Sequence, residues 1–482
     1  MTPPPPPTEL PSPSFHALIL ADLGLASSAE ADAATSEGRT DETGGRGGTG
    51  PFMVDRDDLE EVLASVGPRI GLTPGPDLPA LDIPLRSLDD LHPDALLARL
   101  PLFHALERLV AEGQREGRGG EDEGESEGRG GARAEAGGGL LDQVLAQTPG
   151  PDSGNGIARP VPTPSGTPGD MADFLRRITL PHQVAEPGQR EMDRREMLDR
   201  MRVNHLRAIL HHSRFQAVEG VWRGLEFLVR RLDTGPDLKI WVAHLPGSRA
   251  KAMARGGELG TFLDRARSVA GLDAAWSAVL VHDAFGATAP DLEALAGMAG
   301  VGRERETAFL AEVTPGLLAV AEDPELLARW EALRSHPGAG WMGLLLPRFL
   351  LRAPYGAEEN PCERLDFEEL EPGEGPDPGM LLWGHPGLAA LLLLGRTFRA
   401  RHSDLPRPVP TGVDGLSPIL HRGAGGSALV PPAELMLGGA EVEELAEVGL
   451  IPVVARAGDP TLRFPTVPSV AASGERLRVR GL

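Results

Sequence analysis

Two low-complexity stretches divide the chain, and their positions limit the number of hydrophobic cores that it can form. Glycine, glutamate and arginine dominate residues 113–138, and residues 148–169 are rich in proline, glycine and serine. Segments of this composition have little apolar surface to bury and behave as flexible linkers. Because 482 residues also exceed the usual size of a single core, we predict two folded units, residues 1–112 and 170–482, joined by a linker over residues 113–169.

Three shorter segments differ from the folded units around them. Residues 1–13 are proline-rich and residues 26–50 are rich in glycine, serine and glutamate, so both are expected to be disordered. Inside the linker, residues 140–147 predict a short amphipathic helix whose apolar side chains are Leu140, Leu141, Val144 and Leu145. A helix this short is marginal in water on its own. Its apolar face is therefore expected to need a partner.

Charge and cysteine content limit the compartment and the partners. The formal net charge of −23 repels phosphate backbones and anionic lipid headgroups, so nucleic acid and membranes are not expected partners. The single cysteine, Cys362, excludes an intramolecular disulfide and fits a reducing compartment. The N-terminus has no basic region before an apolar run, and the apolar stretch over residues 388–394 is much shorter than the ~20 residues of a spanning helix. The sequence predicts a cytoplasmic protein.

Apolar periodicity predicts the elements of the first unit. Residues 15–20 form a short apolar run that is typical of a buried strand. Acidic residues over 55–58 precede a helical pattern at 59–66, and we expect one of their side-chain oxygens to cap that helix. A strand at 83–85 and helical segments at 91–100 and 103–110 are predicted to follow.

The second unit alternates between helical and strand patterns. Apolar residues at steps of three and four from 190 to 232 predict an amphipathic helix pair. Helices are then predicted at 258–270, 290–298, 325–333 and 388–401, and strands at 238–242, 278–282, 307–312, 343–346 and 450–454. Such alternation predicts an α/β fold in which mixed sheets are flanked by helices.

Specific motifs for catalysis, cofactors or metals are missing from the sequence. It contains no G-x-x-x-x-G-K-[ST], no G-x-S-x-G and no H-E-x-x-H. Residues 423–428 loosely match a dinucleotide fingerprint, but Pro418 and a weak preceding strand favour a plain glycine loop. The acidic residues at 55–58 lack the glycine and the distal glutamate of an EF-hand. We therefore expect no catalytic residue, no cofactor and no metal, and a protein that is not an enzyme.

His211, His212 and Ser213 are the strongest catalytic candidates that remain. Adjacent helical positions point about 100° apart, so the two imidazoles cannot chelate one metal from a helix. A structural role is therefore favoured, and a hydrolase using His211 and Ser213 is kept as a control hypothesis. The acidic run over residues 368–374, which contains Glu369, is most simply a solvated loop.

Three blocks of the second unit resemble the large subunit of type VI secretion contractile sheaths. The first is LHHSRFQAVEGVWRGL at 210–225, and the second spans 341–356, with NP at 360–361 and LWG at 382–384. The third is at 444–454, and the resemblance covers residues 171–456 approximately. The residues that carry it are expected to be structural: Phe215, Gln216, Glu219, Trp222, Arg223, Gly224, Pro347, Arg348, Phe349, Tyr355, Gly356 and Trp383.

The first unit, over residues 14–112 approximately, is similar to the small subunit of the same sheaths. The similar segments are 15–24, 54–63 and 85–93. The resemblance implies that small and large subunits pair, stack as rings around an inner tube of secreted protein and interlock strands between neighbours. It implies as partners other sheath subunits, the inner tube protein, baseplate proteins and an AAA+ recycling ATPase, to which large subunits offer an N-terminal helix. The segment containing Leu140, Leu141, Val144 and Leu145 matches that helix.

One departure from the family leaves an alternative open. The large subunit usually continues past the third block into a further helix and strand region, whereas residues 461–482 are all that follow it here. The predicted function is a structural component of a contractile sheath, and the alternative is a non-polymerising adaptor, baseplate or cap protein derived from one. Trp222 shares an apolar helix face with Phe215, Val218 and Leu225, so we expect it to be buried against the sheet.

Overall fold

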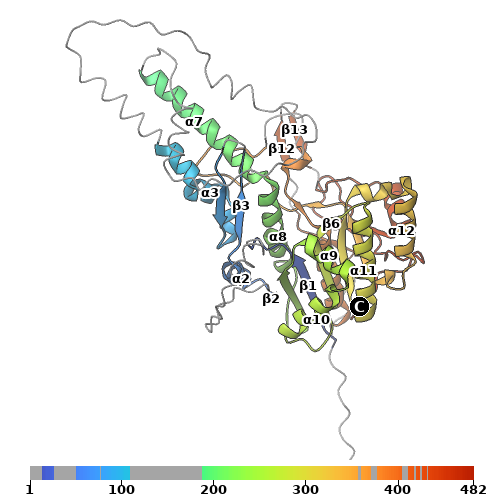
Figure 1. Cartoon of the computed structure of the whole chain (residues 1–482). Helices are drawn as coiled ribbons and strands as arrows, with labels where there is room; N and C mark the ends of the chain where they lie inside the picture. Colours follow the sequence, from blue (N-terminus) through green and yellow to red (C-terminus); the bar gives the residue numbers. More distant parts are fainter. Residues whose placement is uncertain are drawn as a thin grey trace, which may run out of the picture.

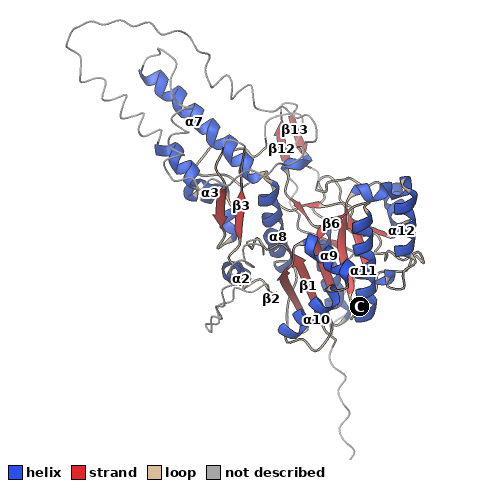
Figure 2. Ribbon diagram, viewed as in Figure 1, coloured by secondary structure: helices blue, strands red, loops and turns tan. Residues whose placement is uncertain are grey.

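A seven-stranded sheet with helices on both faces forms the centre of the molecule (Figure 1, Figure 2). The computed structural model describes residues 13–25, 50–75, 78–108, 187–356, 360–370, 377–403, 411–416, 420–423, 426–430 and 432–482. In spatial order the strands are β14 (Leu450–Pro452), β8 (Met342–Leu346), β7 (Ala308–Val313), β6 (Ala278–Phe285), β1 (Phe15–Ala21), β5 (Leu238–His244) and β2 (Phe52–Val54). Neighbouring strands are parallel except for the antiparallel pair of β2 and β5. The predicted α/β fold with a mixed sheet is confirmed.

Strand β1 lies in the middle of this sheet, between β5 and β6. Phe15 is in register with Leu238 of β5, and Ala17 with Ala278 of β6. All seven residues of β1 are buried, with alternate side chains in the cores on the two faces of the sheet, as a central parallel strand requires. A strand from the predicted first unit thus completes the sheet of the predicted second unit, and the two regions share one core.

The helices form two layers, one on each face of the sheet. One layer contains α8 (Ser213–Val229) and α13 (Pro386–Arg401), whose apolar side chains join those of β1 and β5 in the first core. The other face is covered by α9 (Gly247–Gly256), α10 (Leu259–Val269), α11 (Ala289–Arg305) and α12 (Pro324–Arg334). Helix α14 (Gly439–Glu447) packs Leu445 into this second core.

Residues 50–108 build a small group of elements beside α8. They include α2 (Leu59–Val66), the hairpin of β3 (Arg69–Leu72) and β4 (Leu81–Pro84), the 3-10 helix η1 (Leu88–Leu91), α3 (Pro93–Arg99) and a helix over 101–108. The hairpin packs against α8, and α3 packs against α7 (Pro187–Leu210). Figure 1 shows α7 extending away from the central sheet alongside this group.

Short elements complete the described structure. Three further antiparallel pairs are β9 (Phe349–Leu350) with β10 (Trp383–Gly384), β11 (Gly412–Val413) with β15 (Leu462–Arg463), and β12 (Leu420–Gly423) with β13 (Gly426–Leu429). The remaining 3-10 helices are η2 (Pro315–Glu322), η3 (Ala339–Trp341) and η4 (Pro378–Met380). Within the described ranges, no helix combines the length and apolar character needed to span a bilayer.

The acidic residues ahead of α2 do not cap it as predicted. Asp55 Oδ1 accepts hydrogen bonds from the backbone N–H groups of Asp57 at 2.8 Å and Asp58 at 3.1 Å. Asp58 Oδ1 in turn accepts one from the N–H of Asp55 at 2.7 Å, and it makes no side-chain bond into the helix. The carboxylates are used by the turn itself, because aspartate bonds readily to amides two or three residues away.

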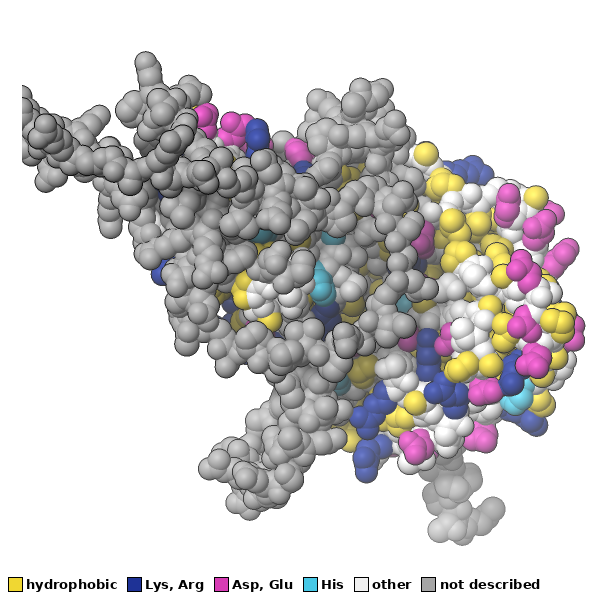
Figure 3. All heavy atoms as spheres, turned by 45° about the horizontal axis from the view of Figure 1, so that its top comes forward, with side chains coloured by type: hydrophobic (Ala, Val, Ile, Leu, Met, Phe, Trp, Pro, Cys, Tyr) yellow, Lys and Arg dark blue, Asp and Glu magenta, His cyan; other side chains and the backbone are white. Residues whose placement is uncertain are grey.

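Charged side chains are interspersed on the described surface. On the face in Figure 3, lysine and arginine mix with aspartate and glutamate, and acidic side chains are frequent along the right-hand edge. This distribution fits the excess of acidic residues in the whole chain.

Candidate functional site

Helix α8 carries the first sequence block and presents its functional side chains. It begins after His212, whose Nδ1 accepts a hydrogen bond from the N–H of Arg214 at 3.1 Å. Glu219 and Arg223 are four residues apart and therefore lie on the same side of the helix. Gly224 lets α13 approach closely, because a Cβ atom there would lie 2.5 Å from Leu388 Cδ1.

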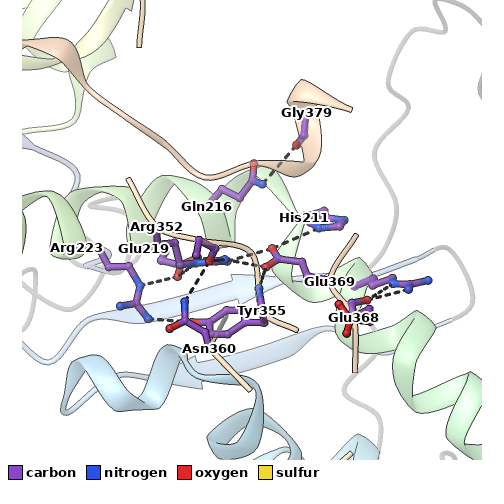
Figure 4. A network of polar contacts seen from close by, with 12 residues as sticks. His211, Gln216, Glu219, Arg223, Arg352, Tyr355, Asn360, Glu368, Glu369 and Gly379 are labelled. Atoms are coloured by element: carbon purple, nitrogen blue, oxygen red, sulfur yellow. Dashed lines mark hydrogen bonds and ion pairs between the residues drawn. The ribbon is translucent and has the colours of Figure 1, made fainter. Parts of the chain in front are cut away.

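Arg352 is the centre of a buried ionic network, shown in Figure 4. Its Nε lies 2.8 Å from Glu219 Oε1, and its Nη1 lies 2.7 Å from Glu369 Oε2. The side chain of Arg352 is 8% exposed, and those of Glu219 and Glu369 are 0% and 1% exposed. Charge-assisted bonds at this depth are strong, and a buried carboxylate without them would be very costly.

Arg223 and Tyr355 extend the network. Arg223 Nε donates to Glu219 Oε1 at 2.7 Å, and its Nη2 donates to the Tyr355 hydroxyl at 2.9 Å. The backbone N–H of Tyr355 donates to Glu369 Oε2 at 2.8 Å, while the guanidinium of Arg352 lies 4.2 Å from the centre of the Tyr355 ring. We call Glu219, Arg223, Arg352, Tyr355 and Glu369 the arginine joint.

The pKa values of the arginine joint follow from burial and from close opposite charges. Burial alone would raise the pKa of Glu369, but Arg352, aided by hydrogen bonds, lowers it to about 2. Burial would likewise lower the pKa of Arg352, but Glu219 and Glu369 hold it well above its ordinary value. Both groups therefore stay charged at neutral pH.

The joint also contacts residues of the predicted first unit. The His92 ring stands edge-on to the Tyr355 ring, with 5.0 Å between their centres. Asp94, at the start of α3, accepts hydrogen bonds from the Cys362 thiol and from the N–H groups of Glu363 and Arg364, each at 2.9 Å. These contacts fix the loop that follows Tyr355 against α3.

Cys362 is protonated at its site beside Asp94. Burial, together with the hydrogen bond to Asp94, raises the pKa of its thiol to about 11. A thiol with so high a pKa is a poor nucleophile and a poor metal ligand near neutral pH.

Trp222 makes a second connection to the N-terminal residues. It is fully buried, as its position on the apolar face of α8 predicts. Its indole N–H donates to the carbonyl of Leu23, just after β1, at 3.3 Å. Arg214, in the first turn of α8, places its Nη1 2.5 Å from Asp22 Oδ2. Both contacts hold helix α8 to the segment that directly follows β1.

A second buried polar group lies at the carboxyl ends of β6 and β7. We call it the histidine cluster, and its members are His282, Glu312, Arg348, His385 and Glu434. Arg348 Nη2 lies 2.6 Å from Glu434 Oε1, whereas its Nε is 3.8 Å from Glu312 Oε1. The rings of His282 and His385 are 4.9 Å apart, and both Nε2 atoms are buried without a hydrogen-bond partner among the described residues.

The histidine cluster is poorly compensated electrostatically. Burial raises the pKa of Glu312 to about 7 and lowers that of His282 to about 4. Burial and the neighbouring His282 lower the pKa of His385 well below its ordinary value. At neutral pH both imidazoles are therefore neutral, and the Nδ1 of His385 accepts the N–H of Gly387 at the start of α13.

One expectation about these residues changes with the structure. The acidic run that contains Glu369 is not simply a solvated loop, because Arg352 and the N–H of Tyr355 bind Glu369 inside the protein. His212 caps α8, and His211 Nε2 lies 3.5 Å from Glu369 Oε1, so both imidazoles have structural contacts in the described protein. Across the described ranges, no group of three or more His, Cys, Asp or Glu side chains is placed to hold a metal ion.

The remaining residues of the sequence blocks lie around α8. Phe215 and Phe349 are fully buried, and Gln216 donates to the carbonyl of Gly379 at 3.4 Å. The indole N–H of Trp383 donates to the carbonyl of Pro378 at 2.8 Å. Pro347 and Gly356 flank the segment that carries Arg348 and Arg352. Leu140, Leu141, Val144 and Leu145 are outside the described residues.

Sequence comparison assigns these blocks to one known domain. Residues 194–252 and 273–471 match the VipB family, described as EvpB/VC_A0108, tail sheath N-terminal domain. The chain belongs to this tail sheath family. All residues of the arginine joint and of the histidine cluster are inside the matched ranges of the sheath domain, whereas β1, β2 and residues 59–108 are outside them.

A similar sheath protein supports the membership. The chain is 26% identical over 284 residues to the type VI secretion system sheath protein TssC1 of Pseudomonas aeruginosa. The aligned region covers 53% of this sheath-family chain and 56% of the relative, so the chain spans about half the length of the relative that it matches.

Proposed function

We propose that the chain is a structural component of a contractile, type VI secretion-like sheath that packs around a secreted inner tube in the cytoplasm. The observation that carries this proposal is the sheath-domain match over residues 194–252 and 273–471. The arginine joint supports it, because its charges are paired inside the protein and it serves packing. The proposed role is assembly, and no catalytic step is assigned to any residue.

We further propose that the N-terminal residues play the part of a small sheath subunit fused to a large one. The position of β1 between β5 and β6 supports this, since the large-subunit sheet would be incomplete without it. So do the bonds from Trp222 to Leu23 and from Asp94 to the loop after Tyr355. A fusion of this kind would fix the two parts at one copy each.

The proposed partners are further copies of this chain or other sheath subunits, the inner tube protein, baseplate proteins and a recycling AAA+ ATPase. The ATPase is proposed to bind the segment with Leu140, Leu141, Val144 and Leu145 in a groove, as amphipathic helices commonly bind. Leu141→Asp with Leu145→Asp should then abolish retention of the cognate ATPase in a pull-down and leave the unfolding temperature unchanged. Retention equal to wild type would reject this binding segment.

Electron microscopy of the purified chain, alone and with its inner tube protein, tests the sheath proposal. The expected result is hollow tubular or ring-shaped polymers whose formation is promoted by the tube protein. A chain that stays monomeric under both conditions contradicts a polymerising role. If such a monomer binds separate full-length sheath subunits in the same preparation, the adaptor or cap role replaces it.

A further inference from the structure

A cavity of about 370 Å³ lies beside the C-terminal half of α8 and has a strongly basic lining. Four arginines line it: Arg223, Arg230, Arg231 and Arg352. Among the described residues that line it, Glu226 is the only acidic one, and Phe227, Leu350, Leu351 and Leu416 supply apolar walls. We call this cavity the arginine pocket. It combines positive charge with apolar surface in a chain whose net charge is −23.

Arg230 and Arg231, at the edge of the pocket, provide positive charge that a ligand could contact. Arg223 and Arg352 are used by the arginine joint, whereas the side chain of Arg230 is 64% exposed and pairs with Glu226 at 2.8 Å. Arg231 donates to the backbone carbonyls of Phe227 and Gly415, and no carboxylate forms an ion pair with it in the described part of the chain. Burial, followed by the nearby charge of Arg396, lowers the pKa of Arg231, against the raising effect of Asp414 and Glu226.

Carboxylates are the anions that fit this pocket best. The planar guanidinium group binds a carboxylate through two parallel hydrogen bonds. Long phosphate polymers are disfavoured by the acidity of the chain as a whole, but glutamate and aspartate side chains on another protein surface are not. The apolar walls require that the acidic ligand also present apolar side chains.

Helix α14 has this combination of side chains on its surface. It contains four exposed glutamates and no lysine or arginine: Glu441, Glu443, Glu444 and Glu447. Just before it, Leu435 and Met436 are 37% and 47% exposed, which is unusual for large apolar residues of this protein. An acidic helix with an adjoining apolar pair complements arginines with adjoining apolar walls.

The arginine pocket and α14 are on different faces of the central sheet. Phe227 and Leu416 of the pocket belong to the core beneath α8 and α13, whereas Leu445 of α14 belongs to the core beneath α9 to α12. Within one molecule the two surfaces are therefore separated by the sheet. A contact between them must join two copies.

We propose that the arginine pocket binds helix α14 of a neighbouring copy of this chain. The contact is heterologous, so every copy keeps one free pocket and one free helix, and repetition generates a ring or a helical polymer. The inference deepens the proposed sheath function and rests on it for its biological setting. The contact itself is a property of two surfaces that can be tested directly.

Two full-length variants separate the halves of the contact. The pocket variant carries Arg230→Glu and Arg231→Glu, and the helix variant carries Glu441→Gln, Glu443→Gln, Glu444→Gln and Glu447→Gln. All of these side chains are at the surface or the edge of the pocket, and unchanged circular dichroism and unfolding temperatures will verify that both variants fold. Arg303→Glu, at an exposed site on α11, reproduces one charge reversal away from the pocket.

Sedimentation velocity of each protein, alone and mixed in equal amounts, gives the result. We expect wild type and Arg303→Glu to self-associate and each contact variant alone to do so far less. The mixture should form a one-to-one pair, because the intact helix of the pocket variant binds the intact pocket of the helix variant. The pair should dissociate in about 1 M salt, because the Debye length is then about 3 Å and salt ions screen the attraction between the arginines and the glutamates.

The outcomes distinguish this inference from the proposed function. A mixture without a pair, or a pocket variant that associates like wild type, overturns the pocket contact even if sheath-like polymers form. A pair that forms from a chain without tubular polymers keeps the contact and rejects the sheath. If the mixture forms no pair while inorganic phosphate binds wild type and not the pocket variant, the pocket is assigned to a free anion and the contact is overturned.

Discussion

Glu369 and Glu312 are both buried carboxylates, yet their surroundings give them opposite properties. Glu369 receives bonds from Arg352 and from the N–H of Tyr355, and its pKa is lowered to about 2. Glu312 is 3.8 Å from Arg348, which is already engaged with Glu434 at 2.6 Å, and its pKa is raised to about 7. Burial is similar at the two sites, so the number of close donors decides the charge.

The comparison separates two kinds of polar core within one sheath-family chain. The arginine joint connects α8 to the segment around Arg352, and its Arg352 and Glu369 stay charged over the physiological pH range. The histidine cluster contains a carboxyl group that titrates near neutral pH and two neutral imidazoles. Of the two groups, only the arginine joint is therefore suited to hold α8 against the segment around Arg352 at every physiological pH.

Replacing Arg352 is expected to have the largest effect. Arg352→Met leaves Glu219 and Glu369 buried without their shared cation, so the free energy of unfolding should fall by about 3–5 kcal/mol. Arg348→Met is the matched control in the histidine cluster. It should cost about 1 kcal/mol or less, because Arg348 is 39% exposed and Glu312 can take up a proton. Urea unfolding followed by circular dichroism measures both, and equal losses would refute the distinction.

Removing the charge of Glu369 should matter at neutral pH and less in acid. The folded-state pKa of about 2 is below the ordinary 4.5, so the ionised group stabilises the fold above pH 4.5 and loses this contribution as the pH falls toward 2. Glu369→Gln should therefore lower the free energy of unfolding by about 3 kcal/mol at pH 7. The difference from wild type should shrink below pH 4.5. A constant difference from pH 7 to pH 3 would contradict the assigned charge state.

Glu312→Gln should give a smaller effect than Glu369→Gln, with the opposite sign. The folded-state pKa of Glu312 is raised from 4.5 to about 7, so its favourable contribution is complete below pH 4.5 and is lost as the pH rises through 7. The neutral amide avoids this loss, and the variant should be more stable than wild type by roughly 1–3 kcal/mol at pH 8. Thermal unfolding at pH 5 and pH 8 measures it. A destabilised variant at pH 8 would show that Glu312 is a paired anion.

Local patterns predicted the elements well where apolar periodicity is strong. The spacing of Phe215, Val218, Trp222 and Leu225 predicts α8 and its buried face, and the apolar run at 15–20 predicts β1. Helix α9 was missed, because Gly247–Gly256 contains only alanine and methionine as apolar residues. The insertion of β1 between β5 and β6 was also missed, since pairing across more than 200 residues leaves no local signal.

The site was predictable only in part, because contacts between residues far apart in the sequence leave no local signal. Glu219 and Arg223 are four residues apart on one helix, and the first sequence block contains both. Glu369 was assigned to solvent because it is in an acidic run. The apolar neighbours Phe367 and Leu370, which are 2% and 6% exposed, were the available indication that this run enters the core.

Expression of residues 1–112 and 170–482 as two separate chains tests the central claim, that the N-terminal and C-terminal regions form one sheath-type body around a shared sheet. The account predicts that the two chains purify together as a one-to-one complex with a single cooperative unfolding transition, and that the larger chain alone, without β1, lacks that transition. If each chain instead purifies alone as a folded monomer and the two do not bind, the claim is contradicted.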